Sequence, residues 1–349
     1  MLKKCHIFAR SVFGVALIFA FGMVLSAQGQ ERKVVVSSWG GDYEKAFRKA
    51  MAEPFEKETG IRVIITSYPD FAKMKAMVDS GNIEWDVVDI EDRMLRRGLR
   101  AGIFEPLDYK VIDKTDILPE MVHQYAVGIE FWAGVIAYSK KKFSWETHPQ
   151  SWADFRDVKK YPGKRALYGN PYMTLEIALL ADGVPKEKIY PIDVSRAFKS
   201  LDRIKPHVSV WWTKGAQPPQ LLTDGEVDLT YAYSGRIAVL KRAGIPVDIE
   251  WNEGLLNPEW LAILKGSKNK KEAMQLIAYC TRAKPQAEFN QMMNYGPVNR
   301  KAWDLIDLKA APDIPTVSTN LGKLVTINGD WWAEHEASVL ERWHGWMIR

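Results

Sequence analysis

Cysteine is scarce in this chain, which has two among its 349 residues. Cys5 lies in a leader-like segment, so the mature protein would keep Cys280 alone and could form no internal disulfide. Cys280 falls on the apolar face of a helix predicted over residues 273–282. We therefore expect it to be a small core residue, in preference to a reactive thiol.

Catalytic and metal-binding signatures are also absent from the sequence. It has no Gly-x-Ser-x-Gly elbow, no phosphate-binding loop and no dinucleotide fingerprint. The histidines that follow the leader are scattered, without a Glu-x-x-His or Cys-x-x-Cys partner: His123, His148, His207, His335 and His344. We expect no cofactor, no metal and no enzymatic activity, unless catalytic groups are assembled in space from distant segments.

One long apolar run occurs, and it lies at the start of the chain. Residues 1–29 have a charged region, an apolar region over 11–25 and a small-residue cleavage site, which together predict a secretory signal peptide. A membrane anchor is the alternative, but the segment is short and has no stop-transfer flank. Loss of the leader's three positive charges would lower the formal net charge from +5 to about +2. With acidic and basic residues intermixed, this low net charge argues against nucleic-acid binding. The signal peptide predicts a periplasmic protein.

The rest of the chain alternates apolar strands with amphipathic helices. The predicted strands lie at residues 34–36, 61–68, 85–90, 134–138, 165–168, 227–233, 246–251 and 259–264. Strand, helix and strand in succession predict parallel sheets with right-handed crossovers. About 320 mature residues exceed what one core usually holds, so two α/β domains are expected.

One stretch collects chemically useful side chains. A strand ends in Trp211-Trp212, a short helix stops at Asp224-Gly225, a second strand covers residues 227–233, and a new helix opens at Ser234. Aromatic rings, a hydroxyl and the guanidinium of Arg236 should therefore gather at the carboxyl ends of neighbouring strands. In open α/β sheets, ligands bind at that edge.

This stretch resembles the binding region of a known family. Tyr233-Ser234-Gly235 stands where the spermidine/putrescine-type extracellular solute-binding proteins of ABC transporters often carry an aromatic-Asn-Gly sequence. Three more segments match the family in order: residues 34–60 with Trp39, residues 151–155, and residues 261–273. The resemblance implies a two-lobed type II periplasmic binding fold, with each lobe a mixed, mainly parallel sheet flanked by helices and a ligand cleft between the lobes.

The resemblance also implies the domain boundaries. After the signal peptide at 1–29, lobe 1 would comprise residues 30–136 and 258–299, and lobe 2 residues 137–257 and 300–349. The lobes would close on a solute by hinge motion and present the closed form to an ABC permease in the inner membrane. We expect a monomer.

Aromatic residues are plentiful, with 14 tryptophans and 13 tyrosines. Their faces bind organic cations, although core packing is the other common use of such rings. The resemblance favours Trp39, Tyr233 and Tyr295, because each matches a family position that lines the cleft. Trp132 and Trp212, beside predicted strand ends, complete the candidate aromatic set.

Charged residues indicate the kind of ligand. By resemblance, Glu259 holds the place of an acid that binds one ligand nitrogen in polyamine-binding relatives. The paired acids that hold the other nitrogen correspond to residues 169–173, which contain no carboxylate. A second ammonium would stay unpaired in a desolvated cleft, at a cost of several kcal/mol, so a long diamine is disfavoured.

Arg236 follows Ser234-Gly235 in the first turn of a helix, where backbone N–H groups and a guanidinium can bind a carboxylate. An arginine near this place resembles the family branch that binds γ-aminobutyrate-like amino acids. A solvated helix arginine is the alternative reading. Asp92, next to Glu91 at the end of the third strand, is another acid that could bind a ligand cation. The alternative is an ordinary first-turn carboxylate that interacts with the helix dipole.

The predicted function is the periplasmic substrate-binding component of an ABC importer. Its ligand would be a small cationic or zwitterionic solute, such as a γ-aminobutyrate-like amino acid or a related amine. A polyamine, or a carboxylate bound by Arg236 without any cation, is the alternative ligand. Other classes left open are a secreted enzyme, a sensor subunit, and a ferric-binding protein that uses Tyr231 and Tyr233.

Overall fold

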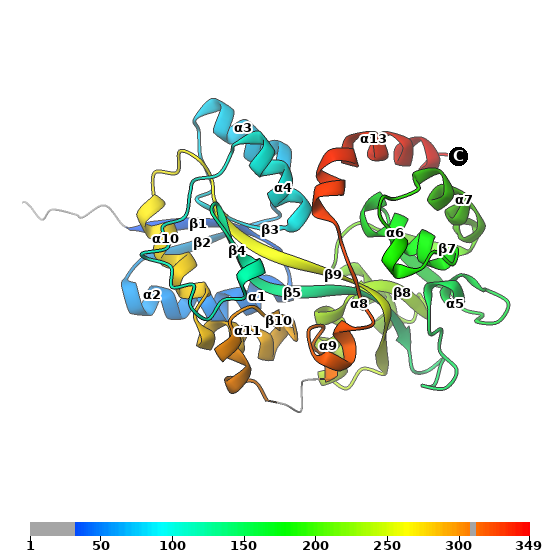
Figure 1. Ribbon diagram of the computed structural model, residues 1–349. Coiled ribbons are helices and arrows are strands. Elements are labelled where there is room, and N and C mark those ends of the chain that lie inside the picture. Colours follow the sequence, from blue (N-terminus) through cyan, green and yellow to red (C-terminus); the bar gives the residue numbers. More distant parts are fainter. Residues whose placement is uncertain (1–31, 308–311) are drawn as a thin grey trace, which may run out of the picture. The chain divides into compact units, whose positions relative to one another are not determined.

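The computed structural model describes residues 32–307 and 312–349 (Figure 1). The predicted signal peptide at residues 1–29 lies outside this range. Within the described part, no helix is both long and apolar enough to cross a membrane. The chain from Arg32 to Arg349 forms one compact unit, and the boundaries between the two lobes stay a prediction.

The strands of the described chain form one 11-stranded sheet. They are β1 (Lys33–Ser38), β2 (Arg62–Ser67), β3 (Val87–Glu91), β4 (Val122–His123), β5 (Ala126–Ser139), β6 (Arg165–Tyr168), β7 (Val208–Trp212), β8 (Leu229–Tyr233), β9 (Val247–Ile263), β10 (Gly296–Pro297) and β11 (Val325–Thr326). The main order is β2-β1-β3-β9-β5-β8-β6-β7. The strands β4 and β10 pair with β5, and β11 pairs with β9.

Two parallel groups of strands stand at the two ends of this order. At one end β1 pairs in parallel with β2 and β3, and at the other β6 pairs in parallel with β7 and β8. The long strands β5 and β9 pair with each other and join the groups through antiparallel pairs with β8 and β3 (Figure 1). The fold is therefore the predicted mixed α/β type, but its strands belong to one continuous sheet.

The strand β9 corrects a sequence prediction. Two separate strands were expected at residues 246–251 and 259–264. The structure has a single strand in which the register with β5 shifts between Gly134 and Ile136. Glu253 takes a positive φ of 59° in this irregular segment, and pairing with β5 continues on both sides of it.

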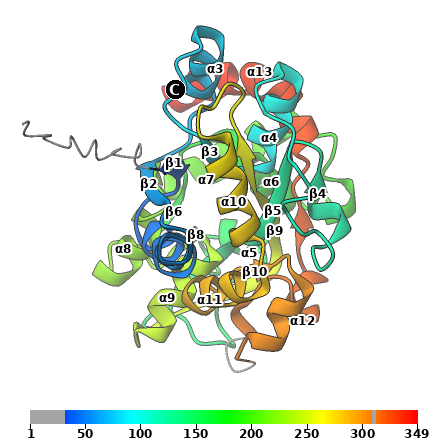
Figure 2. The ribbon, with the colours of Figure 1, turned by 90° about the vertical axis from the view of Figure 1, so that its left-hand side faces the viewer.

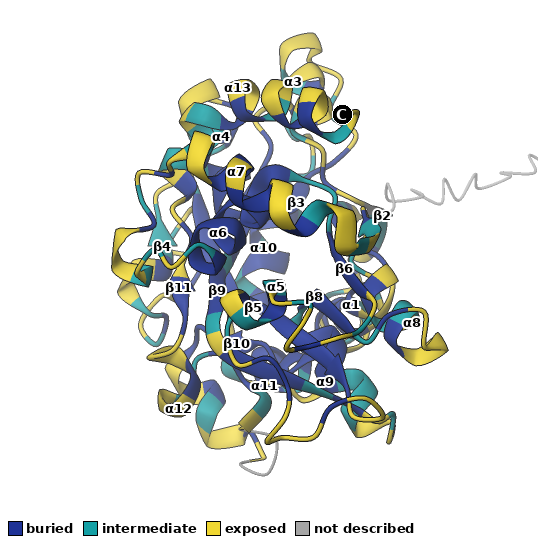
Figure 3. Ribbon diagram, turned by 90° about the vertical axis from the view of Figure 1, so that its right-hand side faces the viewer, coloured by how far each residue is buried: buried dark blue, intermediate teal, exposed yellow. Residues whose placement is uncertain are grey.

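Helices cover the sheet. They are α1 (Asp42–Phe47), α2 (Glu53–Thr59), α3 (Phe71–Ser80), α4 (Asp92–Ala101), α5 (Trp152–Arg156), α6 (Pro171–Ala181), α7 (Val194–Ile204), α8 (Gln217–Asp224), α9 (Ser234–Arg242), α10 (Lys270–Cys280), α11 (Ala283–Met293), α12 (Ser318–Leu321) and α13 (Gly329–Met347). Helices α9 and α11 lie side by side (Figure 2). Figure 3 shows α6 as buried, and every residue of this helix is buried, whereas α3 and α8 carry exposed residues.

Cys280 is buried in α10, as predicted.

The stretch rich in aromatic residues folds as the sequence indicates. Strand β7 ends at Trp212, α8 ends at Gly225 with a φ of 71°, β8 ends at Tyr233, and α9 begins at Ser234. The left-handed conformation at Gly225 has no steric cost for glycine, which explains why the helix stops there. The side chains expected at the strand ends are therefore delivered to one edge of the sheet.

The last helix, α13, packs against more than one part of the fold. Trp343 meets Trp211 of β7 edge-on with ring centroids 5.8 Å apart, and the indole N–H of Trp332 donates to Glu176 of α6 at 2.6 Å. Glu336 of the same helix forms ion pairs with Arg93 and Arg97 of α4. The family resemblance predicted that the last 40 or so residues pack on lobe 2, and this helix also contacts α4, in the segment assigned to lobe 1.

Candidate functional site

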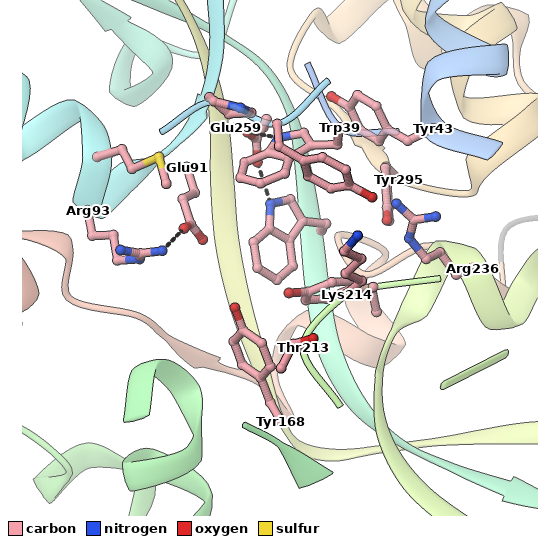
Figure 4. Close-up of a pocket in the computed structure, with 16 residues that line it drawn as sticks. Trp39, Tyr43, Glu91, Arg93, Tyr168, Thr213, Lys214, Arg236, Glu259 and Tyr295 are labelled. Atoms are coloured by element: carbon pink, nitrogen blue, oxygen red, sulfur yellow. Dashed lines mark hydrogen bonds and ion pairs between the residues drawn. The ribbon is translucent and has the colours of Figure 1, made fainter. Parts of the chain in front are cut away.

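A pocket of about 200 Å³ lies at the carboxyl ends of both parallel strand groups (Figure 4). Its lining residues come from strand ends, the loops after them and the first turns of helices: Trp39, Tyr43, Tyr68, Pro69, Glu91, Arg93, Met94, Trp132, Tyr168, Thr213, Lys214, Gly215, Tyr233, Arg236, Glu259 and Tyr295. This is the edge at which ligands bind in open α/β sheets.

A buried carboxylate marks one part of the pocket. Glu259 of β9 is 2% exposed, and each of its oxygens accepts an indole N–H. Trp39 donates to Oε1 at 2.8 Å, and Trp132 donates to Oε2 at 2.7 Å. We call Glu259, with these two tryptophans, the acidic pole.

The electrostatics of the acidic pole make its charge costly. Burial and the negative charges of Asp89 and Glu130 raise the pKa of Glu259 well above its ordinary value. The hydrogen bond from Trp39 opposes this rise. A cation in the pocket would relieve the repulsion and favour the ionised carboxylate, so this part of the site is suited to an ammonium group.

A guanidinium marks another part of the pocket. Arg236, in the first turn of α9, donates through Nη2 to the carbonyl oxygen of Gly40 at 3.2 Å. Its Nε is buried and has no hydrogen-bond partner in the described chain. The exposed Lys214 also lines the pocket, near the ring of Tyr68. We call Arg236 and Lys214 the basic pole; Figure 4 shows Arg236 beside Tyr295 and away from Glu259.

Aromatic rings fill the wall between the poles. Tyr233 meets Trp132 edge-on with ring centroids 5.0 Å apart, and burial raises the pKa of its phenol well above its ordinary value. Two glycines let the wall close tightly. A Cβ at Gly215 would lie 2.6 Å from the ring of Tyr233, and one at Gly235 would lie 2.5 Å from the ring of Tyr295. The tyrosines are therefore neutral rings that can pack on a small organic ligand.

A third charged group lines the pocket but is already paired. Arg93 of α4 forms an ion pair with Glu91 at 2.5 Å and a second ion pair with Glu336. Its guanidinium also lies 4.4 Å from the centre of the Tyr172 ring. Glu91 is therefore neutralised by an arginine, which leaves it less available to a ligand cation than Glu259.

Six of the nine residues predicted for the site line the pocket. They are Trp39, Trp132, Tyr233, Arg236, Glu259 and Tyr295. Their placement brings the predicted aromatic, cationic and anionic groups together. Ligand binding by each of them stays a prediction.

The other three predicted residues do not line the pocket. Asp92 is buried at the start of α4, where it forms an ion pair with Arg96 of the same helix at 3.2 Å and lies beside Gly329 at the start of α13. Trp212 is fully buried behind the wall, where it stacks on Tyr168 at 4.5 Å. Ser234 is also fully buried. Trp212 points inward because side chains alternate between the two faces along β7, and Asp92 and Ser234 point inward because of their positions in the first turns of α4 and α9.

Several lining residues were missed, although some had a usable signal. Tyr68 directly follows β2, Tyr168 ends β6, and Thr213 to Gly215 follow β7. The rule that ligands bind at carboxyl ends of strands would have selected all of these. Arg93 and Met94 lie in the first turn of α4, and the three-dimensional packing of that helix is what shows that they reach the pocket.

The ferric alternative finds little support in this geometry. Tyr231 is fully buried, and its hydroxyl contacts the sulfur of Met173 at 2.7 Å, so it does not line the pocket beside Tyr233. In the described residues no group of three or more His, Cys, Asp or Glu side chains is placed to hold a metal ion. The predicted pair of Tyr231 and Tyr233 is therefore not assembled in this pocket.

A mixed α/β fold with a pocket at the carboxyl ends of its strands, lined by aromatic and charged side chains, is typical of proteins that bind small solutes. A family model described as bacterial extracellular solute-binding protein matches residues 50–316. The chain belongs to this family, as its resemblance predicted.

Individual relatives agree with this assignment. The chain is 37% identical to the gamma-aminobutyric acid-binding protein of Pseudomonas aeruginosa, over 100% of both chains. It is 25% identical to the spermidine/putrescine-binding periplasmic protein of Escherichia coli, over 80% of this chain and 82% of the relative. The solved structure of the Atu4243–GABA receptor matches with a TM-score of 0.83 and 39% identity, over 90% of this chain and 97% of the other.

Proposed function

We propose that this protein is the periplasmic binding component of an ABC importer and captures a small zwitterion such as γ-aminobutyrate. The ligand ammonium would bind at Glu259 and the ligand carboxylate at Arg236. The observation that carries the proposal is the presence, in one pocket, of a buried carboxylate and a buried guanidinium with a free N–H. The γ-aminobutyrate-binding relative and the related receptor structure support the same ligand class.

The size and polarity of the pocket favour a compact ligand with both charges. A cavity of about 200 Å³ is smaller than the roughly 300–1,000 Å³ of sites for drug-sized molecules. Each charged end of the ligand would meet an opposite charge in a largely water-free site. Charge-assisted hydrogen bonds of this kind are the strong ones in proteins.

A polyamine fits these charges less well. The second ammonium of putrescine or spermidine would meet Arg236 and Lys214, and the other acid that lines the pocket, Glu91, is already paired with Arg93. Burying an unpaired charge costs about 3–5 kcal/mol. Polyamines are therefore expected to bind more weakly than γ-aminobutyrate, despite the polyamine-binding relatives.

The two-lobed organisation gives binding a consequence outside the pocket. Glu259 and Trp39 come from the segments predicted for lobe 1, whereas Tyr233 and Arg236 come from those predicted for lobe 2. A zwitterion that bridges the poles would stabilise the closed arrangement, so ligand affinity and closure would be linked. The closed form is the state that an inner-membrane permease would receive, and we expect the protein to present it as a monomer.

Calorimetric titration of the mature chain tests the proposed function. We expect γ-aminobutyrate to bind with one molecule per chain and to be recovered unchanged. Putrescine and spermidine should bind at least about 100-fold more weakly, as the cost of an unpaired charge implies. Tighter binding of putrescine would replace the ligand assignment, and conversion of γ-aminobutyrate to a product would indicate an enzyme.

A second experiment separates transport from sensing. If permease and ATPase genes lie beside this gene, membrane vesicles that contain their products should accumulate labelled γ-aminobutyrate only when the binding protein is added. Uptake that does not depend on the binding protein, or a receptor gene in place of permease genes, would indicate a sensor subunit.

A further inference from the structure

Three neighbouring strands bring buried carboxyl groups together behind the acidic pole. Glu259 of β9 stands opposite Glu130 of β5 and opposite Glu91 of β3 in the sheet register. Asp89 precedes Glu91 by two residues on β3, so it lies on the same face of the sheet. Asp89, Glu130 and Glu259 are 0%, 2% and 2% exposed. We call these three residues the carboxylate cluster.

The cluster has donors but no cation. Ser38 donates its hydroxyl to Oδ2 of Asp89 at 2.8 Å, and the two indoles donate to Glu259. No lysine or arginine of the described chain forms an ion pair with any of the three carboxyl groups, whereas the adjacent Glu91 has Arg93. The cluster therefore holds up to three negative charges in a place shielded from bulk solvent.

Several polar atoms of the cluster are unpartnered. Both oxygens of Glu130, Oδ1 of Asp89 and the hydroxyl of Tyr43 are buried without a hydrogen-bond partner in the described residues. Buried carboxylates without cations neutralise themselves by binding protons. Burial raises the pKa of Asp89 to about 7. The pKa of Glu130 is raised well above its ordinary value, mainly by burial and to a smaller extent by the negative charge of Asp89.

The other groups that face the cluster supply no positive charge. Burial and the nearby carboxylates raise the pKa of the Tyr43 phenol, and burial and Asp89 raise that of the Cys280 thiol. The facing groups, taken from each element packed against the cluster, are Ser38 and Trp39 (β1 and its end), Tyr43 (α1), Glu91 (β3), Trp132 (β5), Cys280 (α10) and Tyr295 (before β10). Three arginines act on these facing groups and not on the cluster itself: Arg93 lowers the pKa of Glu91, Arg236 that of Tyr295 and Arg282 that of Cys280.

We propose that an ammonium group entering the acidic pole displaces a proton from the carboxylate cluster, so that capture of the ligand is coupled to proton release. This inference rests on the proposed function, because it requires a cationic ligand. The O–H bond of one protonated carboxyl group breaks, and that proton passes to solvent. The ligand ammonium keeps its own protons and pairs with the carboxylate, so one positive charge enters as another leaves.

The sign of the pH dependence follows directly. Protons and the ammonium group compete for the cluster, so affinity falls as pH decreases below the apparent pKa of the empty site. With one proton exchanged, the Kd rises by up to about tenfold for each unit of pH in that range. At pH values above that apparent pKa, the affinity becomes constant. The charged groups of γ-aminobutyrate resemble a side-chain carboxyl and a lysine, which titrate near 4 and 10, so the ligand keeps its charges between pH 5.5 and 8.

Calorimetry with γ-aminobutyrate as the probe tests the inference. Titrations of the mature chain at pH 6, in buffers of different ionisation enthalpy, give the number of protons exchanged from the slope of observed enthalpy against buffer enthalpy. We expect net release of a proton, together with a Kd that tightens from pH 5.5 to pH 8. Binding with no proton exchange and a constant Kd would overturn this inference alone. Failure of γ-aminobutyrate to bind at any pH would instead overturn the proposed function.

Two variants locate the proton. Glu130→Gln removes a carboxyl group that does not line the pocket, and it keeps the side-chain shape. We expect this variant to bind γ-aminobutyrate with a shallower pH dependence and fewer protons released, and Asp89→Asn to act in the same direction. The exposed Glu53→Gln is the matched control and should behave as the unmodified chain does. Unchanged proton release in both cluster variants would contradict the inference.

Discussion

The two poles of the pocket are built in different ways. Glu259 and Trp132 of the acidic pole lie on β9 and β5, the long strands that run through the middle of the sheet, and both oxygens of Glu259 are already held by indoles. Arg236 of the basic pole lies in the first turn of a helix, and Lys214 lies in an exposed loop after β7. Arg236 also keeps a donor without a partner in the described residues.

This difference indicates a division of labour. A carboxylate fixed by two hydrogen bonds in a sheet is preorganised, so it can select for an ammonium group at little cost in side-chain entropy. The buried Nε–H of Arg236, which has no partner in the described residues, is a donor that a ligand carboxylate can satisfy. We expect the acidic pole to decide whether a ligand binds and the basic pole to decide how tightly and in which orientation.

Removal of the charge at the acidic pole should have the largest effect. Glu259→Gln keeps the shape of the side chain but leaves the ligand ammonium without a counter-charge in a buried site. Loss of one partner in such a pair costs about 2–5 kcal/mol, so affinity for γ-aminobutyrate should fall about 30-fold or more. Calorimetric titration measures this, with the exposed Glu53→Gln as the control. A loss of less than tenfold would show that the ammonium binds elsewhere.

Removal of the guanidinium should have the next largest effect. Arg236→Ala deletes a charged hydrogen-bond donor, and such bonds contribute about 1.5–3 kcal/mol, so affinity should fall roughly 10- to 100-fold. Its one protein hydrogen bond in the described chain is to the Gly40 carbonyl, so the melting temperature without ligand should change little. Lys214→Ala, at an exposed site of the same pole, is the comparison and should weaken binding less. An equal effect of the two substitutions would contradict the assignment of Arg236.

A smaller effect is expected from crowding the aromatic wall near the basic pole. The Cβ of Gly215→Ala would lie 2.6 Å from the Tyr233 ring, so the ring must shift. Overpacking of this kind costs about 1 kcal/mol or more, which corresponds to affinity that is several-fold weaker. Gly345→Ala in α13 is the control, because apart from its chain neighbours and the nearby backbone of α13 no atom lies within 4 Å of the new Cβ. Unchanged affinity in Gly215→Ala would indicate that the wall is free to adapt.

The smallest effect on binding is expected outside the poles. Glu336→Gln removes one of the two carboxylates paired with Arg93. It also removes the ion pair between residue 336 and Arg97. The loss of a charged bond should reduce the free energy of unfolding by about 1–3 kcal/mol in a denaturant titration. Affinity should stay within about twofold, because Glu91 still neutralises Arg93. Glu341→Gln, exposed on the same helix, should change neither quantity.

The sequence predicted the fold class and a large part of the site. Periodicity located β7, α8, β8 and α9, and the rule about strand ends placed Tyr233 and Arg236 at the correct edge. Glu259 and Tyr295 depended on family resemblance, because nothing in their local sequence distinguishes them from other residues of a buried strand or loop. Sequence pattern alone would therefore have missed half of the zwitterion site.

What the sequence could not predict depends on tertiary packing. The turn-like Asn252-Glu253-Gly254 is held inside a long strand only because β5 pairs on both sides of it. Asp92 and Arg93 are neighbours, yet the orientation of α4 turns the arginine toward the pocket and the aspartate toward α13. The carboxylate cluster is likewise formed by sheet register, from residues that are far apart in the chain.

A crystal structure of the mature protein with bound γ-aminobutyrate tests the two-pole arrangement most directly. We predict that the ligand nitrogen lies within hydrogen-bond distance of a Glu259 oxygen and that the ligand carboxylate accepts the free Nε–H of Arg236. A ligand bound in the reverse direction, or bound with no contact to Glu259, would contradict the arrangement.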